Sequence, residues 1–256
     1  MSTPLLELRA CTIKFGGLTA VNSINLKIDS GRIFGIIGPN GAGKTTIFNL
    51  ITGIYKPTSG DIYLNSLNIS GMKSHRINST GIARTFQNIR LFREMTVLEN
   101  VTVAMRHLSR KSFIGTIFQT PDYLLNLDSV IQESRQLLAK FNLQDSCDEE
   151  AGSLSYGQQR KLEIVRALAT KPKLLLLDEP AAGMNPQEKT ELKGLIRQIR
   201  EGFDLTVLII EHDMGVMMDL CEQIAVLDYG VKIADGTPQE VRRNPAVIKA
   251  YLGEDF

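Results

Sequence analysis

Only three of the 256 residues are cysteines, and Cys11, Cys147 and Cys221 lie far apart with no CxxC spacing. Thiols this few and this scattered exclude a disulfide framework and a zinc site, and they suit a reducing compartment. The chain also has almost no net charge, because 29 basic residues face 28 acidic ones, for a formal charge of +1. This balance argues against broad attraction to nucleic acid or acidic lipid, so no nucleic-acid partner is expected.

Long apolar runs are missing as well. No uninterrupted stretch approaches the roughly 20 residues that a helix needs to cross a bilayer. The opening segment MSTPLLELRA lacks the basic start and the apolar stretch of a signal peptide. We therefore expect a cytoplasmic protein that, if it serves a membrane, does so from outside the bilayer.

What the sequence does contain is an alternation of strand-like and helix-like segments. Leu174–Leu177 and Thr206–Ile210 are short apolar runs, typical of strands buried on both faces of a parallel sheet. Between them, the segment 185–188 (NPQE) supplies an N-cap, a proline and a capping glutamate, which predicts a helix that runs to about Gly202. This alternation predicts an α/β fold. The stretch 87–153 has helical periodicity instead, and we expect an inserted, mainly helical subdomain there.

A P-loop follows the apolar segment 32–37. Its glycines permit positive φ and a close approach of phosphate oxygens, and its N–H groups form an anion site with the start of the next helix. Lys44 can reach the β- and γ-phosphates, and the Thr45 hydroxyl can ligate Mg²⁺. The pattern GxxxxGK[ST] therefore predicts a nucleoside triphosphate site. The residues are Gly38, Pro39, Asn40, Gly41, Ala42, Gly43, Lys44, Thr45 and Thr46.

Two further features suit the chemistry of a bound triphosphate. At the carboxyl end of Leu174–Leu177, Asp178 would hold Mg²⁺ and Glu179 would act as general base toward the attacking water. The structural alternative is a solvent-facing acidic pair after a core strand. Shortly before this strand, Ser155-x-x-Gln158 is a capping box at a helix start. A capped helix start that includes a glycine is also an anion site.

Taken in order, these motifs resemble those of ATP-binding cassette (ABC) proteins. The segment 154–160, LSYGQQR, resembles the signature LSGGQ with Tyr156 in place of a glycine, and Asn185 stands where the D-loop usually has aspartate. The resemblance implies that the signature contacts phosphate, that a glutamine senses Mg²⁺ and the γ-phosphate, that a histidine contacts the γ-phosphate, and that an aromatic ring stacks on adenine. Read singly, the last three would be a loop amide, a structural histidine and a core aromatic. The residues concerned are Ser155, Gly157 and Gln158, then Gln87, His212 and Phe15.

The resemblance covers nearly the whole chain and implies an architecture and a mechanism. The expected fold is a P-loop NTPase cassette in one domain, 1–256. Residues 1–86 and 154–256 would form a recombinase-like nucleotide-binding core with an antiparallel β subdomain, and residues 87–153 an inserted, mainly helical subdomain. The family's cassettes dimerise head to tail, so that each ATP lies between one P-loop and the partner's signature. ATP closes the pair and hydrolysis opens it. The implied cofactors are ATP and Mg²⁺, with Thr45, Gln87 and Asp178 around the metal.

Three stretches resemble the branched-chain amino acid importer branch, namely 15–21 (FGGLTAV), 90–100 (RLFREMTVLEN) and 244–253 (NPAVIKAYLG). The insert from about His107 to Asp128 resembles the LivG-type subunit rather than the shorter LivF-type. The implied partners are a second cassette, either LivF-type or a copy of this chain, transmembrane permease subunits and, indirectly, a substrate-binding protein. The cassette would lie on the inner face of the cell membrane. Cassettes for urea or amide import and for lipopolysaccharide export share parts of these patterns.

Two other classes fit less of the sequence. A soluble ABC ATPase that acts on DNA or ribosomes usually has a long coiled coil between P-loop and signature, or two cassettes in one chain. A P-loop kinase gives no reason for the signature or for His212. By family geometry, Leu91, Phe92 and Met95 lie near the groove for the permease, where they could be exposed anchors or core residues.

Overall fold

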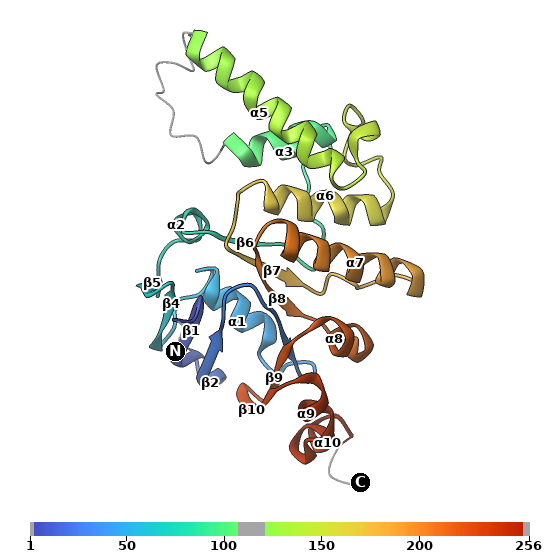
Figure 1. The fold of residues 1–256 in the computed structure, drawn as a ribbon. Helices are drawn as coiled ribbons and strands as arrows, with labels where there is room; N and C mark the ends of the chain where they lie inside the picture. The colour runs from blue at the N-terminus through green and yellow to red at the C-terminus, as the bar shows by residue number, and fades with distance from the viewer. Residues whose placement is uncertain (1–2, 107–120, 253–256) are drawn as a thin grey trace. The chain divides into compact units, whose positions relative to one another are not determined.

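The structure is a computed structural model that describes residues 3–106 and 121–252. Most of the predicted insert 107–128 and the last residue of the stretch 244–253 therefore lie outside the described residues. The chain divides into two compact units, one formed by residues 1–87 and 173–256 and the other by residues 88–172. Figure 1 shows the chain from the N-terminus in blue to the C-terminus in red.

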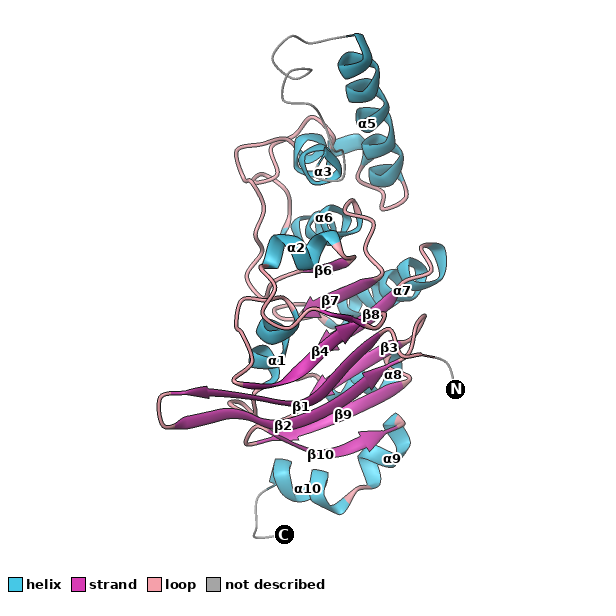
Figure 2. Ribbon diagram, turned by 90° about the vertical axis from the view of Figure 1, so that its left-hand side faces the viewer, coloured by secondary structure: helices cyan, strands magenta, loops and turns pink. Residues whose placement is uncertain are grey.

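The first unit contains two sheets (Figure 2). The smaller sheet is antiparallel, with the strand order β2-β1-β4-β5. The larger has the order β10-β9-β3-β8-β7-β6, and it is parallel from β9 to β6, with β10 as an antiparallel edge. The bounds are β1 Leu6–Phe15, β2 Leu18–Ile28, β4 Ser59–Leu64 and β5 Leu67–Asn68 in the small sheet, and β3 Ile33–Ile37, β6 Ile82–Arg84, β7 Leu174–Asp178, β8 Thr206–Ile210, β9 Gln223–Asp228 and β10 Val231–Gly236 in the large one.

The central strands of the large sheet are buried on both faces, as their apolar runs predict. Every residue of β3, β7 and β8 is buried, because helices and the second sheet cover a parallel sheet on both sides. On one face the core joins Phe34 of β3 to Phe48 of the following helix and to Leu26 of the small sheet. On the other face a helix packs close to β3 at Gly35, where a Cβ would meet the Met217 side chain at 2.4 Å.

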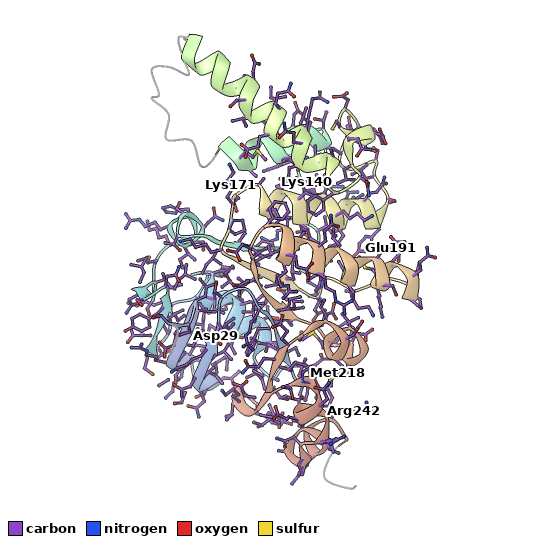
Figure 3. All side chains as sticks on the ribbon, in the orientation of Figure 1. Asp29, Lys140, Lys171, Glu191, Met218 and Arg242 are labelled. Atoms are coloured by element: carbon purple, nitrogen blue, oxygen red, sulfur yellow. The ribbon has the colours of Figure 1, made fainter. Side chains whose placement is uncertain are left out.

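Six described helices belong to the first unit. The longest, α7, begins where the capping pattern predicts, because the Asn185 side chain accepts a hydrogen bond from Glu188 N–H (3.0 Å) and the Glu188 carboxylate accepts one from Asn185 N–H (2.8 Å). Its exposed face carries charged side chains such as Glu191 (Figure 3). The helices are α1 Lys44–Ile51, α2 Ser74–Ser79, α7 Pro186–Gly202, α8 Met214–Leu220, α9 Pro238–Arg243 and α10 Pro245–Leu252.

The described part of the second unit is helical. Its elements are α3 Val97–Arg106, α5 Pro121–Ala139, the short 3-10 helix η1 Gln144–Ser146 and α6 Tyr156–Leu168. α6 packs against both α3 and α5. Within α6, Arg160 and Glu163 form an ion pair at 2.8 Å, and both side chains are almost fully buried.

The two units divide the chain differently from the sequence-based prediction. That prediction placed residues 154–256 in the core and residues 87–153 in the insert. Contacts instead group α6 with the second unit, because it packs on α3 and α5, and they leave Gln87 in the first unit. In the ranges 3–106 and 121–252, no helix has both the length and the apolar character to span a membrane.

Candidate nucleotide-binding site

The P-loop connects β3 to α1, and its three glycines have the positive φ that the sequence predicts. The angles are 152° at Gly38, 81° at Gly41 and 99° at Gly43. A Cβ at Gly38 would meet the Leu227 carbonyl oxygen at 2.1 Å, and one at Gly43 would meet the Ala20 carbonyl oxygen at 2.8 Å. At Gly41 nothing lies within 4 Å. The loop is therefore fixed against β9 and β2 on two sides and open at Gly41.

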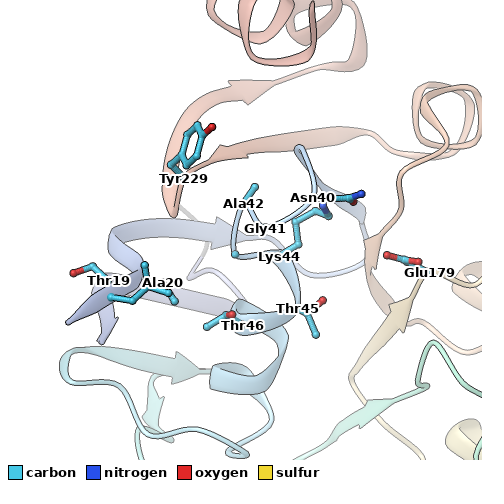
Figure 4. Close-up of a pocket in the computed structure, with 12 residues that line it drawn as sticks. Thr19, Ala20, Asn40, Gly41, Ala42, Lys44, Thr45, Thr46, Glu179 and Tyr229 are labelled. Atoms are coloured by element: carbon cyan, nitrogen blue, oxygen red, sulfur yellow. The ribbon is translucent and has the colours of Figure 1, made fainter. Parts of the chain in front are cut away.

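A cavity of about 430 Å³ lies over this loop (Figure 4). One side is formed by the start of β2 and by the turn between β9 and β10, and the opposite side by Glu179 after β7. Seven consecutive P-loop residues form its floor. The lining residues are Leu18, Thr19, Ala20, Asn40, Gly41, Ala42, Gly43, Lys44, Thr45, Thr46, Glu179 and Tyr229.

Lys44 is the buried cation of the cavity. Its Nζ donates hydrogen bonds to the carbonyl oxygens of Gly38 at 2.7 Å and Pro39 at 2.9 Å. Burial lowers the pKa of Lys44 below its ordinary value, and the negative charges of Glu179 and Asp178 oppose that shift. A bound anion would replace these neutral carbonyl oxygens as the acceptor for the ammonium group. A hydrogen bond to a charged acceptor is stronger than one to a neutral acceptor.

Asp178 is nearly buried at the end of β7 and forms an ion pair that the sequence reasoning missed. Arg84 of β6 donates from Nη2 to Asp178 Oδ2 at 2.6 Å, and both side chains are only 6% exposed. The same guanidinium donates from Nη1 to the side chains of Asn49 (2.7 Å) and Thr52 (3.3 Å), both in or next to α1. Arg84 therefore connects the helix that follows the P-loop to the predicted Mg²⁺ carboxylate.

Glu179 brings together the three residues predicted to be catalytic. Its Oε2 accepts a hydrogen bond from Gln87 Nε2 at 2.7 Å and lies 3.7 Å from His212 Nδ1. Its backbone has φ = 46°, in the left-handed region that residues other than glycine rarely adopt. Residues held in this conformation are found more often at functional sites. The fully buried Glu211 accepts hydrogen bonds from Ala181 N–H (2.7 Å) and His212 N–H (3.1 Å), and so ties the segment after β7 to the segment after β8.

Phe15 does not line the cavity. Its side chain is half-exposed at the end of β1, and its ring meets the Tyr55 ring edge-on at a centroid distance of 5.0 Å. The apolar part of the lining comes instead from Leu18, Ala20, Ala42 and Tyr229. Tyr229 lies in the turn between β9 and β10, and sequence reasoning gave this side chain no role. The one signal that marked it was a tyrosine where such turns favour asparagine or aspartate.

The predicted signature lies in the second unit, where its local geometry is that of a capping box. Ser155 Oγ accepts a hydrogen bond from Gln158 N–H at 3.4 Å, and Gln158 Oε1 accepts one from Ser155 N–H at 3.1 Å. Tyr156, which replaces the usual glycine, is 46% exposed, and its hydroxyl accepts a hydrogen bond from the buried Arg160 at 3.4 Å. The substitution thus leaves the helix start intact. In the same unit, Phe92 is 52% exposed and Leu91 and Met95 are partly exposed, so none of the three is a buried core residue.

The donor set of the first unit suits a magnesium nucleotide. The Thr45 hydroxyl and the Asp178 carboxylate are hard oxygen donors, which Mg²⁺ prefers. The open glycine loop and the Lys44 ammonium supply the N–H groups and the cation that phosphates require. The cavity can therefore hold a nucleotide with its phosphates at the loop and Glu179 on one side.

Comparisons with known proteins agree with this geometry. The sequence model of a family described as ABC transporter matches residues 21–182, and one described as branched-chain amino acid ATP-binding cassette transporter matches residues 231–256. The chain is 48% identical to the high-affinity branched-chain amino acid transport ATP-binding protein BraF of Pseudomonas aeruginosa, across 99% of this chain and 100% of that protein. It is 44% identical to LivG of Escherichia coli K12, which has the same description, with the same coverage.

Two solved structures share the fold. One is a nucleotide-free ATP-binding cassette from an ABC transporter, with a TM-score of 0.85 and 30% identity, covering 98% of this chain and 100% of that one. The other is a dimeric cassette in a post-hydrolysis state, bound to ADP and Pi, with a TM-score of 0.75 and 25% identity over 91% of this chain and 98% of that one. With its P-loop, its cavity and these relatives, the chain belongs to the ABC transporter family as one of its nucleotide-binding ATPase cassettes.

Proposed function

We propose that this cassette hydrolyses ATP to energise the uptake of branched-chain amino acids. It would work at the inner face of the cell membrane, as one of a head-to-tail pair of cassettes attached to permease subunits that a substrate-binding protein serves. The second cassette would be a LivF-type subunit or a copy of this chain. Ser155, Gly157 and Gln158 would contact the nucleotide held by that partner's P-loop.

The proposed chemistry assigns a role to each residue around Glu179. Glu179 takes the proton of the attacking water, and Gln87 holds its carboxylate in place through the 2.7 Å hydrogen bond. Lys44 and the loop N–H groups stabilise the charge on the phosphoryl oxygens, and His212 contacts the γ-phosphate beside Glu179. Thr45, Asp178 and Gln87 would hold Mg²⁺, which neutralises phosphate charge when bound.

One observation carries the hydrolytic role. Glu179 lines the same cavity as Lys44 and Thr45, and its carboxylate lies within hydrogen-bonding distance of Gln87. An acidic residue that was merely exposed to solvent after a core strand would not be expected to line the cavity over the phosphate loop. The cargo rests on different support, namely the identity to two branched-chain amino acid relatives along the whole chain and the family match at residues 231–256.

Glu179→Gln tests the hydrolytic role. We expect ATP binding to persist, while ATP hydrolysis falls by about 10²- to 10⁴-fold, the range that general-base catalysis supplies. Gel filtration with ATP should then show accumulated dimer. Glu191→Gln, which changes an exposed carboxylate on α7, is the matched control and should hydrolyse ATP normally. Wild-type hydrolysis by the Glu179→Gln variant would refute the assignment of the base.

The cargo is tested through the partners. Permease subunits and a binding protein that co-purify with the cassette can be reconstituted with it in liposomes. ATP-dependent uptake of leucine, isoleucine and valine is expected, with no uptake of urea or acetamide. Uptake of urea or acetamide in place of leucine would leave the ATPase role standing and overturn the cargo.

A further inference from the structure

We propose that Tyr229 is a nucleobase contact of the P-loop cavity, with its ring against the aromatic base of the bound nucleotide. The proposal rests on the proposed function only in taking the ligand to be a nucleotide. Tyr229 stands at the tip of the β9–β10 hairpin, more than 180 residues after the P-loop, and the resemblance to the family gives it no role.

The turn itself does not call for a tyrosine. Asp228 pairs with Val231, which leaves a two-residue turn with φ = 41° at Tyr229 and 78° at Gly230. Turns with positive φ at both positions favour Asn-Gly or Asp-Gly. A bulky side chain at positive φ is an outlier, and such outliers collect at functional sites. Something other than the backbone must favour the ring.

Packing does not explain the ring either. Tyr229 is 88% exposed, the highest value among the large hydrophobic side chains in the described part of the chain. Its ring therefore adds little to the core of the first unit. A large exposed aromatic at a cavity rim is a candidate for ligand contact.

The backbone under the ring is nevertheless fixed. Gly230 N–H donates to the Ala42 carbonyl of the P-loop at 3.1 Å, and Asn22 N–H donates to the Gly230 carbonyl at 2.8 Å. A Cβ on Gly230 would meet the Ala20 carbonyl oxygen at 2.6 Å, so the turn sits directly on β2. Tyr229 is thus held at the rim by contacts to the phosphate loop and to the strand beside it.

The cavity has a polar side and an apolar side. Lys44 and Thr45 lie at its floor with Glu179 beyond them, whereas Thr19, Ala20 and Tyr229 lie on the other side of the loop (Figure 4). A nucleotide with its phosphates at the floor and its γ-phosphate toward Glu179 places its base on the side of Tyr229. Exposed side chains change rotamer within nanoseconds, so the ring can settle on the base when it arrives.

Tyr229 also lines a second cavity of about 570 Å³, formed with residues 39–42 of the P-loop and with Lys249 of α10. A ring that served a ligand there would leave nucleotide affinity unchanged when it is removed. Affinities for ADP and for pyrophosphate separate the two cases, because pyrophosphate has the phosphates of ADP without its base.

The test is Tyr229→Asn, measured by titration calorimetry with ADP and with pyrophosphate, each with Mg²⁺. Asparagine suits the turn, so the melting temperature should equal or exceed that of the wild type. Loss of base stacking should raise the Kd for ADP by about 5- to 150-fold while the Kd for pyrophosphate stays unchanged. Tyr229→Phe, which keeps the ring, should bind ADP like the wild type. Ile248→Asn removes another exposed apolar side chain, outside both cavities, and should change neither affinity.

Either of two results would overturn the proposal. Unchanged ADP affinity in Tyr229→Asn would show that the ring makes no nucleobase contact. Equal losses for ADP and pyrophosphate would show that the substitution distorts the P-loop instead. If Tyr229→Asn melts below the wild type, Tyr229→Gly provides the same comparison, since Gly-Gly also fits this turn. A wild-type protein that binds no ADP would count against the proposed function, not against the role of Tyr229 within it.

Discussion

Replacing Arg84 with methionine should destabilise the first unit more than most single substitutions. The guanidinium is 6% exposed and pairs with Asp178, which is equally buried, at 2.6 Å. It also donates to Asn49 at 2.7 Å and lies over the rings of Phe48 and Phe86. Methionine keeps much of the apolar stem but leaves a buried carboxylate without its cation, and breaking a buried pair in this way costs about 3–5 kcal/mol.

Urea denaturation followed by far-UV circular dichroism measures this cost, since the chain has no tryptophan to serve as a fluorescence probe. Each kcal/mol lowers the melting temperature of a domain of this size by about 2–4 °C, so a drop of about 6–20 °C is expected. Arg197→Met is the matched control. Arg197 and Asp219 form an ion pair at 3.0 Å with side chains 46% and 47% exposed, and such surface pairs contribute about 0–1 kcal/mol.

A double-mutant cycle decides whether the pair itself is responsible. Asp178→Asn alone leaves the Arg84 cation buried without its anion, so it should also destabilise the fold. The double variant Arg84→Met with Asp178→Asn leaves no unpaired charge and should cost clearly less than the sum of the two single variants. Additive costs, or a loss in Arg84→Met no larger than in the Arg197→Met control, would refute the reasoning.

Three further predictions follow from the same structure. Gly38→Ala should abolish ADP binding or folding, because its Cβ would meet the Leu227 carbonyl oxygen at 2.1 Å. Gly41→Ala has open space around its Cβ, so it should lower the free energy of unfolding only by the roughly 1–2 kcal/mol that a left-handed conformation costs a residue other than glycine. Circular dichroism and ADP titration would compare the two variants. Burial raises the pKa of Cys11 to about 11 and of Cys221 to about 12, so at mildly alkaline pH both should react with a thiol reagent only after urea unfolds the chain, and prompt labelling of the native protein would contradict this. The Lys189 ammonium and then the Val216 N–H lower the pKa of Asp213 below the ordinary 3.8, so its stabilisation is complete above that value and is lost as the pH falls through the lowered pKa. The destabilisation by Asp213→Asn should therefore be present at neutral pH and fade below 3.8 in thermal scans, and a cost that stays constant with pH would exclude the ion pair as its source.

Local patterns in the sequence predicted much of the first unit, because their physical causes are local. A five-residue apolar run can be buried on both faces only in the middle of a covered sheet, and β7 and β8 are such strands. The capping residues before Pro186 satisfy N–H groups within one turn of the helix, so they fix where α7 begins. The P-loop glycines are required by positive φ, which a sequence pattern records directly.

Contacts between distant segments were not predictable in this way. Arg84 and Asp178 are 94 positions apart and meet only because β6 pairs with β7. Phe15, which the family resemblance predicts to stack on the base, is not among the residues that line the cavity, whereas Tyr229 is. The stacking role of Phe15 stays a prediction. The predicted boundary after residue 153 differs from the contact-based one for a related reason, since α6 begins with the predicted signature but packs on α3 and α5.

Because β6 pairs with β7, both acidic residues of the site form contacts with one short segment of the chain. Arg84, the last residue of β6, contacts Asp178, the last residue of β7. Gln87, three residues after Arg84, contacts Glu179, the residue after Asp178. The predicted metal carboxylate and the predicted base are therefore both held from the same segment, 84–87, and not from the P-loop. Arg84 also donates to Asn49 and Thr52 at the end of α1, the helix that begins with Lys44. Residues 84–87 therefore connect the predicted metal carboxylate and the predicted base to the helix that carries Lys44, so a substitution at Arg84 should affect both phosphate binding and hydrolysis.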